Sequence, residues 1–200
     1  GVDAGELRRR QDADPICIWS DGSPAPVVDL PTPGVLLSVD LLSVGGAPVG
    51  YLARRHQPPI DLARRDLAVD RYWTRIVETA ERGVVLEPDQ FYILATRERL
   101  RVPPDLCAEL VAFDATKGEL RTHYAGFIDS GFGWSEEASE GARLVLEIRT
   151  RDVPFLLEHG QPLFRVELMR NEDRPDVLYG ASGSHYQHQG LRLAKQFRGT

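Results

Sequence analysis

The sequence has few residues that would mark a membrane, secreted or metal-binding protein. No run of about 18 apolar residues is present, so we expect no membrane-spanning segment. No basic start followed by an apolar stretch is present either, so no secretion signal is predicted. The only two cysteines, Cys17 and Cys107, fit no metal-binding spacing. Two lone cysteines favour a reducing compartment, although a single disulfide also fits them, and we expect a cytoplasmic protein.

Positive charge is scarce as well. The 200 residues carry 24 Lys and Arg against 30 Asp and Glu, a net charge of −6. Sequence-independent nucleic-acid binding needs clustered basic residues, so no nucleic-acid partner is expected. A small anion can still bind, because a local basic pocket suffices. The length and the apolar fraction of 42% are typical of one soluble domain, alone or with an extension, and the start at Gly1 suggests an excised fragment or a trimmed end.

Changes in composition divide the chain into three parts. Residues 1–33 hold four prolines between positions 24 and 33, which predicts an arm or linker, with a disordered tail as the alternative. Residues 34–172 read as the globular domain. Residues 173–200 are polar and contain several glycines, which predicts a tail closing over a site or a neighbouring domain.

Most of the central part is predicted to form short strands. Apolar runs at 91–95, 144–148 and 164–168 alternate with glycine and proline turn signals, which favours a sandwich or barrel. One helix is predicted over 61–80, where apolar residues recur at helical spacing. No alternation of strands and helices and no internal repeat is evident, so the expected fold class is all-β.

Five stretches resemble, in order and spacing, the dCTP deaminase family and its sister family, the dUTPases. They are LSVDL at 37–41, PDQFYILA at 88–95 with VPPDL at 102–106, GFIDSGFG at 126–133, LVLE at 144–147 with HGQ at 159–161, and Tyr179 followed by HYQHQG at 185–190. The final stretch favours the deaminases over the dUTPases. The closest likeness is to the second half of a long tandem form, in which two barrel domains share one chain.

This resemblance implies a fold, an assembly and a reaction. The implied fold is a dUTPase-like barrel, of β-clip or jelly-roll type, with one short helix and an extended C-terminal tail. The implied partners are other such barrels, in a homotrimer or a tandem-domain assembly with sites at domain interfaces. The implied reaction hydrolyses dCTP to dUTP and ammonia. Zinc-dependent nucleobase deaminases need H-x-E and P-C-x-x-C motifs, which are absent, so we expect no zinc and only Mg²⁺ bound with the triphosphate.

The strand predicted at 144–148 carries the residue best suited to proton transfer. Strand alternation puts Glu147 on the same face as Arg143 and Arg149, and Arg149 lies about 7 Å away along the strand. Nearby positive charge favours an ionised carboxylate. Such a group can take a proton from an attacking water and pass one to a leaving amine. A salt-bridged solvent face is the alternative, and the resemblance at Leu146-Glu147 favours catalysis.

The resemblance also suggests residues that bind the substrate. Asp129 would hold the sugar 3′-hydroxyl, unless it only forms a turn with its own backbone. Four tail residues would fold over the nucleotide, unless the tail simply packs on a neighbouring domain; they are Tyr179, His185, Tyr186 and Gln189. The family usually has a lysine where His185 stands, which weakens the phosphate contact implied there. Asp40 could reach Mg²⁺ through water, although capping a turn is the favoured reading.

One family motif is missing. The deaminase loop S-S-x-x-R has no counterpart between Phe113 and Arg121, although Thr116 and Arg121 are possible stand-ins at a different spacing. The other half of a tandem protein could supply these groups to a shared site, which we favour, or this half could be a scaffold. Both explanations predict that the chain alone is inactive or nearly so. A dUTPase-type pyrophosphatase and a non-catalytic structural or nucleotide-binding half-domain remain the alternative functions.

Overall fold

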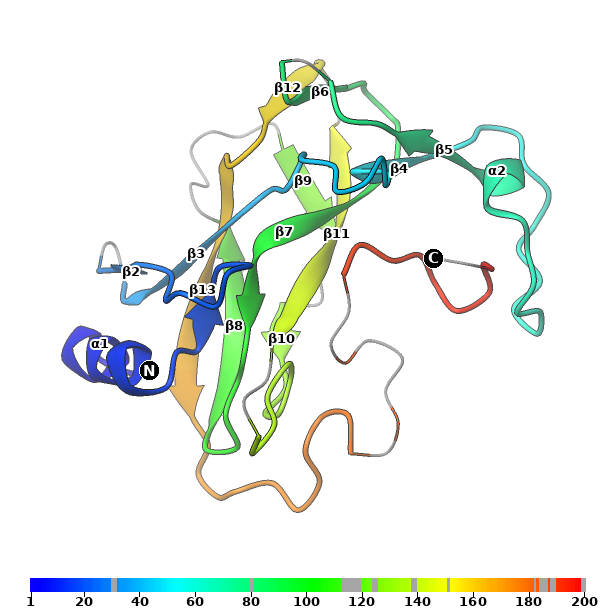
Figure 1. Ribbon diagram of the computed structural model, residues 1–200. Helices are drawn as coiled ribbons and strands as arrows, with labels where there is room; N and C mark the ends of the chain where they lie inside the picture. The colour runs from blue at the N-terminus through cyan, green and yellow to red at the C-terminus, as the bar shows by residue number, and fades with distance from the viewer. Residues whose placement is uncertain are drawn as a thin grey trace.

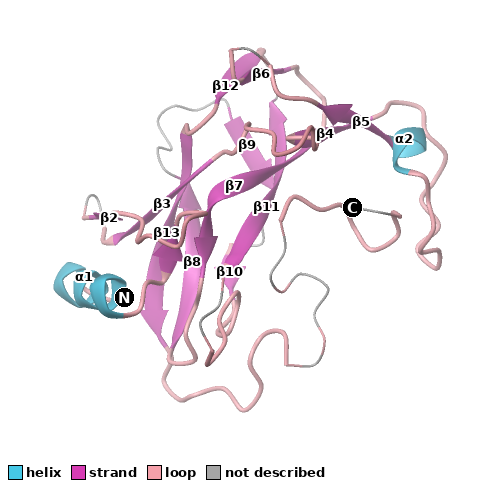
Figure 2. Ribbon diagram, in the orientation of Figure 1, coloured by secondary structure: helices cyan, strands magenta, loops and turns pink. Residues whose placement is uncertain are grey.

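The computed structural model describes residues 1–29, 32–79, 81–112, 120–123, 126–137, 140–150, 152–181, 183, 187 and 190–198, with only the backbone at 112 and 120–123. Strands form the centre of the molecule, and the helices lie at its margins (Figures 1 and 2). The elements are α1 Ala4–Ala13, β1 Cys17–Ile18, β2 Val27–Val28, β3 Gly34–Ser38, β4 Gly50–Ala53, α2 Val69–Tyr72, β5 Trp73–Ile76, β6 Gly83–Leu86, β7 Tyr92–Leu100, β8 Leu106–Ala112, β9 Leu120–His123, β10 Phe127–Ile128, β11 Ala142–Thr150, β12 Phe155–Glu158 and β13 Pro162–Arg170.

The strands pair into three antiparallel sheets. The first has the order β5-β4-β7-β11-β9, with β1 also paired to β7. The second has the order β10-β8-β13-β3-β2, and the third consists of β12 and β6. This arrangement confirms the predicted all-β class. Within the described residues the sheets stay open at their edges, so they form no closed barrel.

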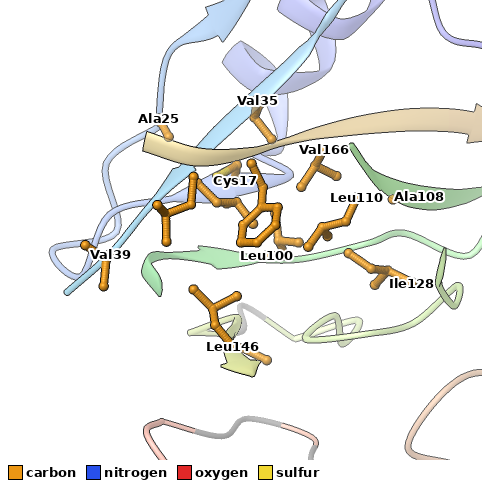
Figure 3. Close-up of a cluster of buried hydrophobic side chains, with 14 of the residues drawn as sticks. Cys17, Ala25, Val35, Val39, Leu100, Ala108, Leu110, Ile128, Leu146 and Val166 are labelled. Carbon is orange, nitrogen blue, oxygen red and sulfur yellow. The ribbon is translucent and has the colours of Figure 1, made fainter. Parts of the chain in front are cut away.

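The main hydrophobic core lies between the two larger sheets. Its side chains come from both sheets, for example Leu100 and Leu146 from the first and Leu110 and Val166 from the second (Figure 3). In β11, Leu146 and Ile148 are buried whereas Glu147 and Arg149 are exposed. The predicted alternation in this strand is therefore confirmed, and it turns the charged side chains away from the core.

A second, smaller core covers the outer face of the first sheet. Tyr51 of β4, Trp73 of β5 and Ile93 of β7 pack there against Leu193 and Phe197 of the C-terminal segment. Figure 1 shows this segment, in red, on the same side of the molecule as α2. The C-terminal segment thus returns to the face of the sheet on which Glu147 lies.

The helix predicted over 61–80 is wrong for most of its length. Only Val69–Tyr72 is helical, and the chain then enters β5, whose residues pair with β4 from Gly50↔Ile76 to Ala53↔Trp73. Tryptophan, threonine and isoleucine favour strands where a neighbouring strand is available. Leu62, an expected member of the apolar helix face, is 71% exposed.

The N-terminal segment predicted as an arm is folded onto the sheets. The Asp3 side chain caps α1 by accepting a hydrogen bond from the Glu6 N–H at 2.9 Å. The buried Gln11 amide then bonds the backbone of Ile16, Cys17 and Ala25. In the described part of the chain, neither helix is both long and apolar enough to cross a membrane.

Candidate active site

The Glu147 side chain lines a cavity on the outer face of the first sheet. In the sheet register it is flanked by Ile93 of β7 and His123 of β9. The cavity has a volume of about 300 Å³. Its lining includes Trp73, Phe91, Ile93, Glu147, Arg192 and Leu193. One wall is therefore aromatic and belongs to the sheet, and another belongs to the returning C-terminal segment.

The cavity combines a proton-transfer group with a surface suited to a planar ring. The rings of Trp73 and Phe91 have centroids 6.0 Å apart and are tilted by 45°. Aromatic faces of this kind can stack on or pack against a nucleobase. The buried Nε1–H of Trp73 has no acceptor among the described residues, so this wall also holds an unused hydrogen-bond donor.

The two arginines on the Glu147 face have different environments. Arg143 donates to the Thr96 carbonyl and, at 2.8 Å, to Oδ2 of Asp40. Burial lowers the pKa of Arg143, and the charge of Asp40 opposes this shift. Arg149 instead lies over the ring of Phe91, with 4.9 Å between Cζ and the ring centroid. Among the described residues Glu147 forms no ion pair, so the alternative of a salt-bridged solvent face is not observed for this residue.

Asp40 lies at a turn, bound by protein donors. Its Oδ1 accepts the Leu42 N–H at 3.0 Å, as expected of a side chain that caps a turn, and its Oδ2 accepts from Arg143. The Nδ1 of His159 accepts the Leu41 N–H at 3.1 Å, and burial lowers the pKa of this histidine. Both carboxylate oxygens of Asp40 already accept hydrogen bonds, and no cluster of three metal-binding side chains occurs in the described ranges. Asp40 therefore fits a turn cap better than a Mg²⁺ ligand.

Asp129 and Tyr179 share a second cavity, of about 510 Å³. Its lining includes Cys107, Phe127, Asp129, Asn171, Val177 and Tyr179. Asp129 follows β10 directly, and no hydrogen bond of its carboxylate is found among the described residues, so the expected alternative of a self-bonded turn is not observed. The Tyr179 ring packs on Phe132, with 5.4 Å between centroids. The start of the tail therefore lies beside Asp129.

Gly131 and Gln187 hold the tail against the turn that follows β10. A Cβ on Gly131, whose φ is 94°, would lie 2.8 Å from Cβ of Leu178 and 2.9 Å from the Tyr179 nitrogen. Only glycine allows this close approach. The Gln187 amide donates to the Gly131 carbonyl at 3.0 Å and accepts the Gly133 N–H at 3.1 Å. We did not single out Gln187 from the sequence; its only signal was its place in the HYQHQG stretch.

The remaining predicted residues are only partly placed. Thr116, His185, Tyr186 and Gln189 lie outside the described residues. Arg121 lies in β9 at the position paired with Arg149, and only its backbone is described. The structure thus brings Asp129 and Tyr179 together, places Glu147 in a separate cavity, and leaves Asp40 at a turn.

Comparisons with known proteins show the family to which the chain belongs. Residues 4–197 match the model of the family described as the C-terminal domain of 2′-deoxycytidine 5′-triphosphate deaminase. A protein of Halobacterium salinarum named "dCTP deaminase, dUMP-forming" is 34% identical over 154 residues, 73% of this chain and 72% of that one. One of the same name from Mycolicibacterium vanbaalenii is 31% identical over 123 residues, 60% of each chain.

A solved structure is similar over nearly the whole chain. The 2′-deoxycytidine 5′-triphosphate deaminase of Agrobacterium tumefaciens matches with a TM-score of 0.76 and 35% identity, covering 90% of this chain and 50% of that one. This chain therefore spans only half the length of that protein. The fold is that of the dUTPase-like all-β domains. The chain belongs to the family of dCTP deaminase C-terminal domains.

Proposed function

We propose that this chain is the C-terminal half of a tandem, zinc-independent deaminase that hydrolyses dCTP to dUTP and ammonia. One observation carries the proposal: Glu147 lies at an aromatic-walled cavity without an ion-pair partner in the described residues, at the position that the family resemblance assigns to catalysis. The names of two relatives and of a solved structure support dCTP as the substrate.

Glu147 would handle both protons of the reaction. Its carboxylate takes a proton from a water molecule while the water oxygen bonds to C4 of cytosine. The same proton then passes to the exocyclic nitrogen as the bond between C4 and that nitrogen breaks, and ammonia leaves. The second proton of the water moves from the new oxygen through Glu147 to N3, which gives the C4 carbonyl of uracil. A carboxylate within hydrogen-bond reach of water and amine can perform both transfers. Mg²⁺ would accompany the triphosphate, and no step at Glu147 needs a metal.

The partners in this proposal are the nucleotide and other dUTPase-like barrels. Asp129 and Tyr179 would bind the sugar side of the nucleotide, while residues of a second barrel close the exposed side of Glu147. We place the assembly, a trimer or its tandem equivalent, in the cytoplasm. Membranes and nucleic acids have no role in it.

The decisive variant is Glu147→Gln in the tandem protein, because it keeps the shape and removes the base. We expect release of ammonia from dCTP to fall by about 10²–10⁴-fold, the usual contribution of a general acid-base group. The matched control is Glu158→Gln, which changes an exposed carboxylate on β12 and should leave the rate unchanged. A Glu147→Gln protein that deaminates at the wild-type rate would contradict the proposal.

A second activity, cleavage of the triphosphate, has specific support. Both relatives carry "dUMP-forming" in their names, and forming dUMP from dCTP needs a pyrophosphatase step as well as deamination. Mass spectrometry of the products separates the cases. Ammonia with dUTP indicates deamination alone, ammonia with dUMP and pyrophosphate indicates both steps, and pyrophosphate from dUTP without ammonia from dCTP indicates a dUTPase-type enzyme.

A further inference from the structure

We propose that Arg149 provides the fixed positive charge that stabilises the reaction at Glu147. The inference rests on the proposed function, because it assigns a second residue to the same site. Its starting point is the position of Arg149, two residues beyond Glu147 on the exposed face of β11. Two residues of strand correspond to about 7 Å, within reach of a long arginine side chain.

The guanidinium group of Arg149 is held against an aromatic residue of the cavity wall. The register of β11 against β7 pairs Glu147 with Ile93 and Ile148 with Tyr92, so Arg149 lies beside Phe91. Its Cζ is 4.9 Å from the centroid of the Phe91 ring, and Phe91 lines the Glu147 cavity. Stacking on an aromatic face restrains the planar cation without neutralising its charge.

Of the two arginines on the Glu147 face, Arg149 is the one whose charge is not offset by an acidic side chain of the described residues. Arg143 is bound to Asp40 and to the Thr96 carbonyl, whereas Arg149 has no acidic partner in the described part of the chain.

The topology indicates which part of a substrate Arg149 faces. Along the paired strands β9 and β11, Arg149 comes first and Glu147 follows, and the chain between the two strands, which carries β10 and Asp129, leaves β9 at the Glu147 end. The proposed function puts the sugar at Asp129 and the base at Glu147, and in that arrangement the base is the part of the nucleotide next to Arg149. The phosphates lie on the sugar side, so Arg149 acts on the reacting edge of the base.

Arg149 would act by electrostatics and keep its own proton. When Glu147 takes a proton from water, the oxygen that bonds to C4 carries developing negative charge, and electron density moves onto N3 of the ring. A guanidinium stays protonated at any physiological pH and needs no reorganisation during this step. Fixed charges aimed at developing charge stabilise it more in a shielded cavity than in water.

The test uses the tandem protein and three changes at position 149. We expect Arg149→Gln to lower kcat for ammonia release by about 10²–10³-fold, with KM for dCTP nearly unchanged. Arg149→Lys keeps a charge without the planar fork and should retain an intermediate rate. Added guanidinium ion should partly restore Arg149→Ala, which a purely structural role would not allow.

A matched control comes from Arg71, which also lies over an aromatic ring, with Cζ 6.0 Å from the centroid of Tyr72; unlike Phe91, Tyr72 does not line the cavity. Arg71→Gln should keep the wild-type kcat. An unchanged kcat in Arg149→Gln overturns the inference, and so does a rise in KM alone, which would indicate phosphate binding. Wild-type protein that releases no ammonia overturns the proposed function itself, a result visible before any variant is compared.

Discussion

Glu98 is an acidic residue buried between the two larger sheets, with 2% of its surface exposed. Its carboxylate accepts hydrogen bonds from the Ser38 N–H at 2.7 Å and the Ser38 hydroxyl at 2.6 Å. Burial raises the pKa of Glu98 above its ordinary value of 4.5, and the bonds from Ser38 oppose the shift. The folded protein therefore binds this proton more tightly than the unfolded chain does.

This difference predicts a pH dependence of stability. The protonated Glu98 favours the folded state fully below pH 4.5, and that contribution is lost as pH rises from 4.5 through the raised pKa. Glu98→Gln can keep both bonds to Ser38, because its amide oxygen accepts and its NH₂ group donates to the hydroxyl. The variant has no proton to lose.

We therefore expect the free energy of unfolding of the wild type, relative to Glu98→Gln, to fall as pH rises through this window. Each unit of difference between the folded and unfolded pKa is worth about 1.4 kcal/mol. Urea unfolding of both proteins at several pH values measures the difference. A constant difference across the window would show that Glu98 titrates alike in both states.

At the scale of elements, the C-terminal segment 191–198 builds one wall of the candidate active site. Leu193 and Phe197 are buried against the second core, and the Phe197 ring packs edge-on to Trp73 at 6.0 Å. Leu67 donates to the Gln196 carbonyl at 3.0 Å and accepts the Arg198 N–H at 3.1 Å. Two buried side chains and a short bridge thus hold the segment in place.

Phe197→Ala should release this segment while leaving the main core intact. Removing a buried phenylalanine lowers the free energy of unfolding by about 3–5 kcal/mol. This loss exceeds the stability that the few other contacts of this segment can provide. We expect faster hydrogen exchange at 191–198 and around Leu67, with little change in β8 or β13, and a higher KM for dCTP because Leu193 leaves the cavity wall. Val44→Ala, at an exposed position that lines neither described cavity, is the control. Unchanged exchange in Phe197→Ala would mean that other contacts fix the segment.

The elements also show which parts of the secondary structure a local sequence pattern can predict. Apolar runs at 91–95, 144–148 and 164–168 were predicted as strands and lie in β7, β11 and β13. Their alternation or burial is a local property, so the sequence reveals it. The helix predicted at 61–80 failed because Trp73–Ile76 pairs with Gly50–Ala53, a partner twenty residues or more earlier that no helical period can indicate.

The candidate site could also be predicted only in part, because some of its features are local and others depend on tertiary contacts. The exposed orientation of Glu147 follows from strand alternation, and the motif order indicated that Asp129 and Tyr179 belong to one site. Glu147 lines a different cavity, one wall of which is formed by residues 192–194, and this depends on where the tail returns after leaving the second sheet. This is a tertiary contact, and no residue in the stretch 144–148 indicates it.

At the scale of the whole molecule, Glu147 remains exposed in this chain, and the described residues that bound its cavity come from the sheet and the tail. The net charge of −6 also disfavours a triphosphate in the absence of a local basic surface. Since this chain matches half of the Agrobacterium tumefaciens deaminase, the other half of a tandem protein could cover the exposed side. An enclosed site excludes water and strengthens every electrostatic interaction within it.

The isolated 200-residue chain should therefore fold but turn over dCTP at least about 10²-fold more slowly than the tandem protein, because even small misplacement of reacting groups costs that much. Cooperative thermal unfolding, followed by circular dichroism, confirms that the fragment is folded before ammonia release is measured. Adding the separately expressed N-terminal half should restore activity, and the same addition to a Glu147→Gln fragment should not. Full activity of the fragment alone would instead show that these residues form a complete site, with Glu147 enclosed by copies of the same chain.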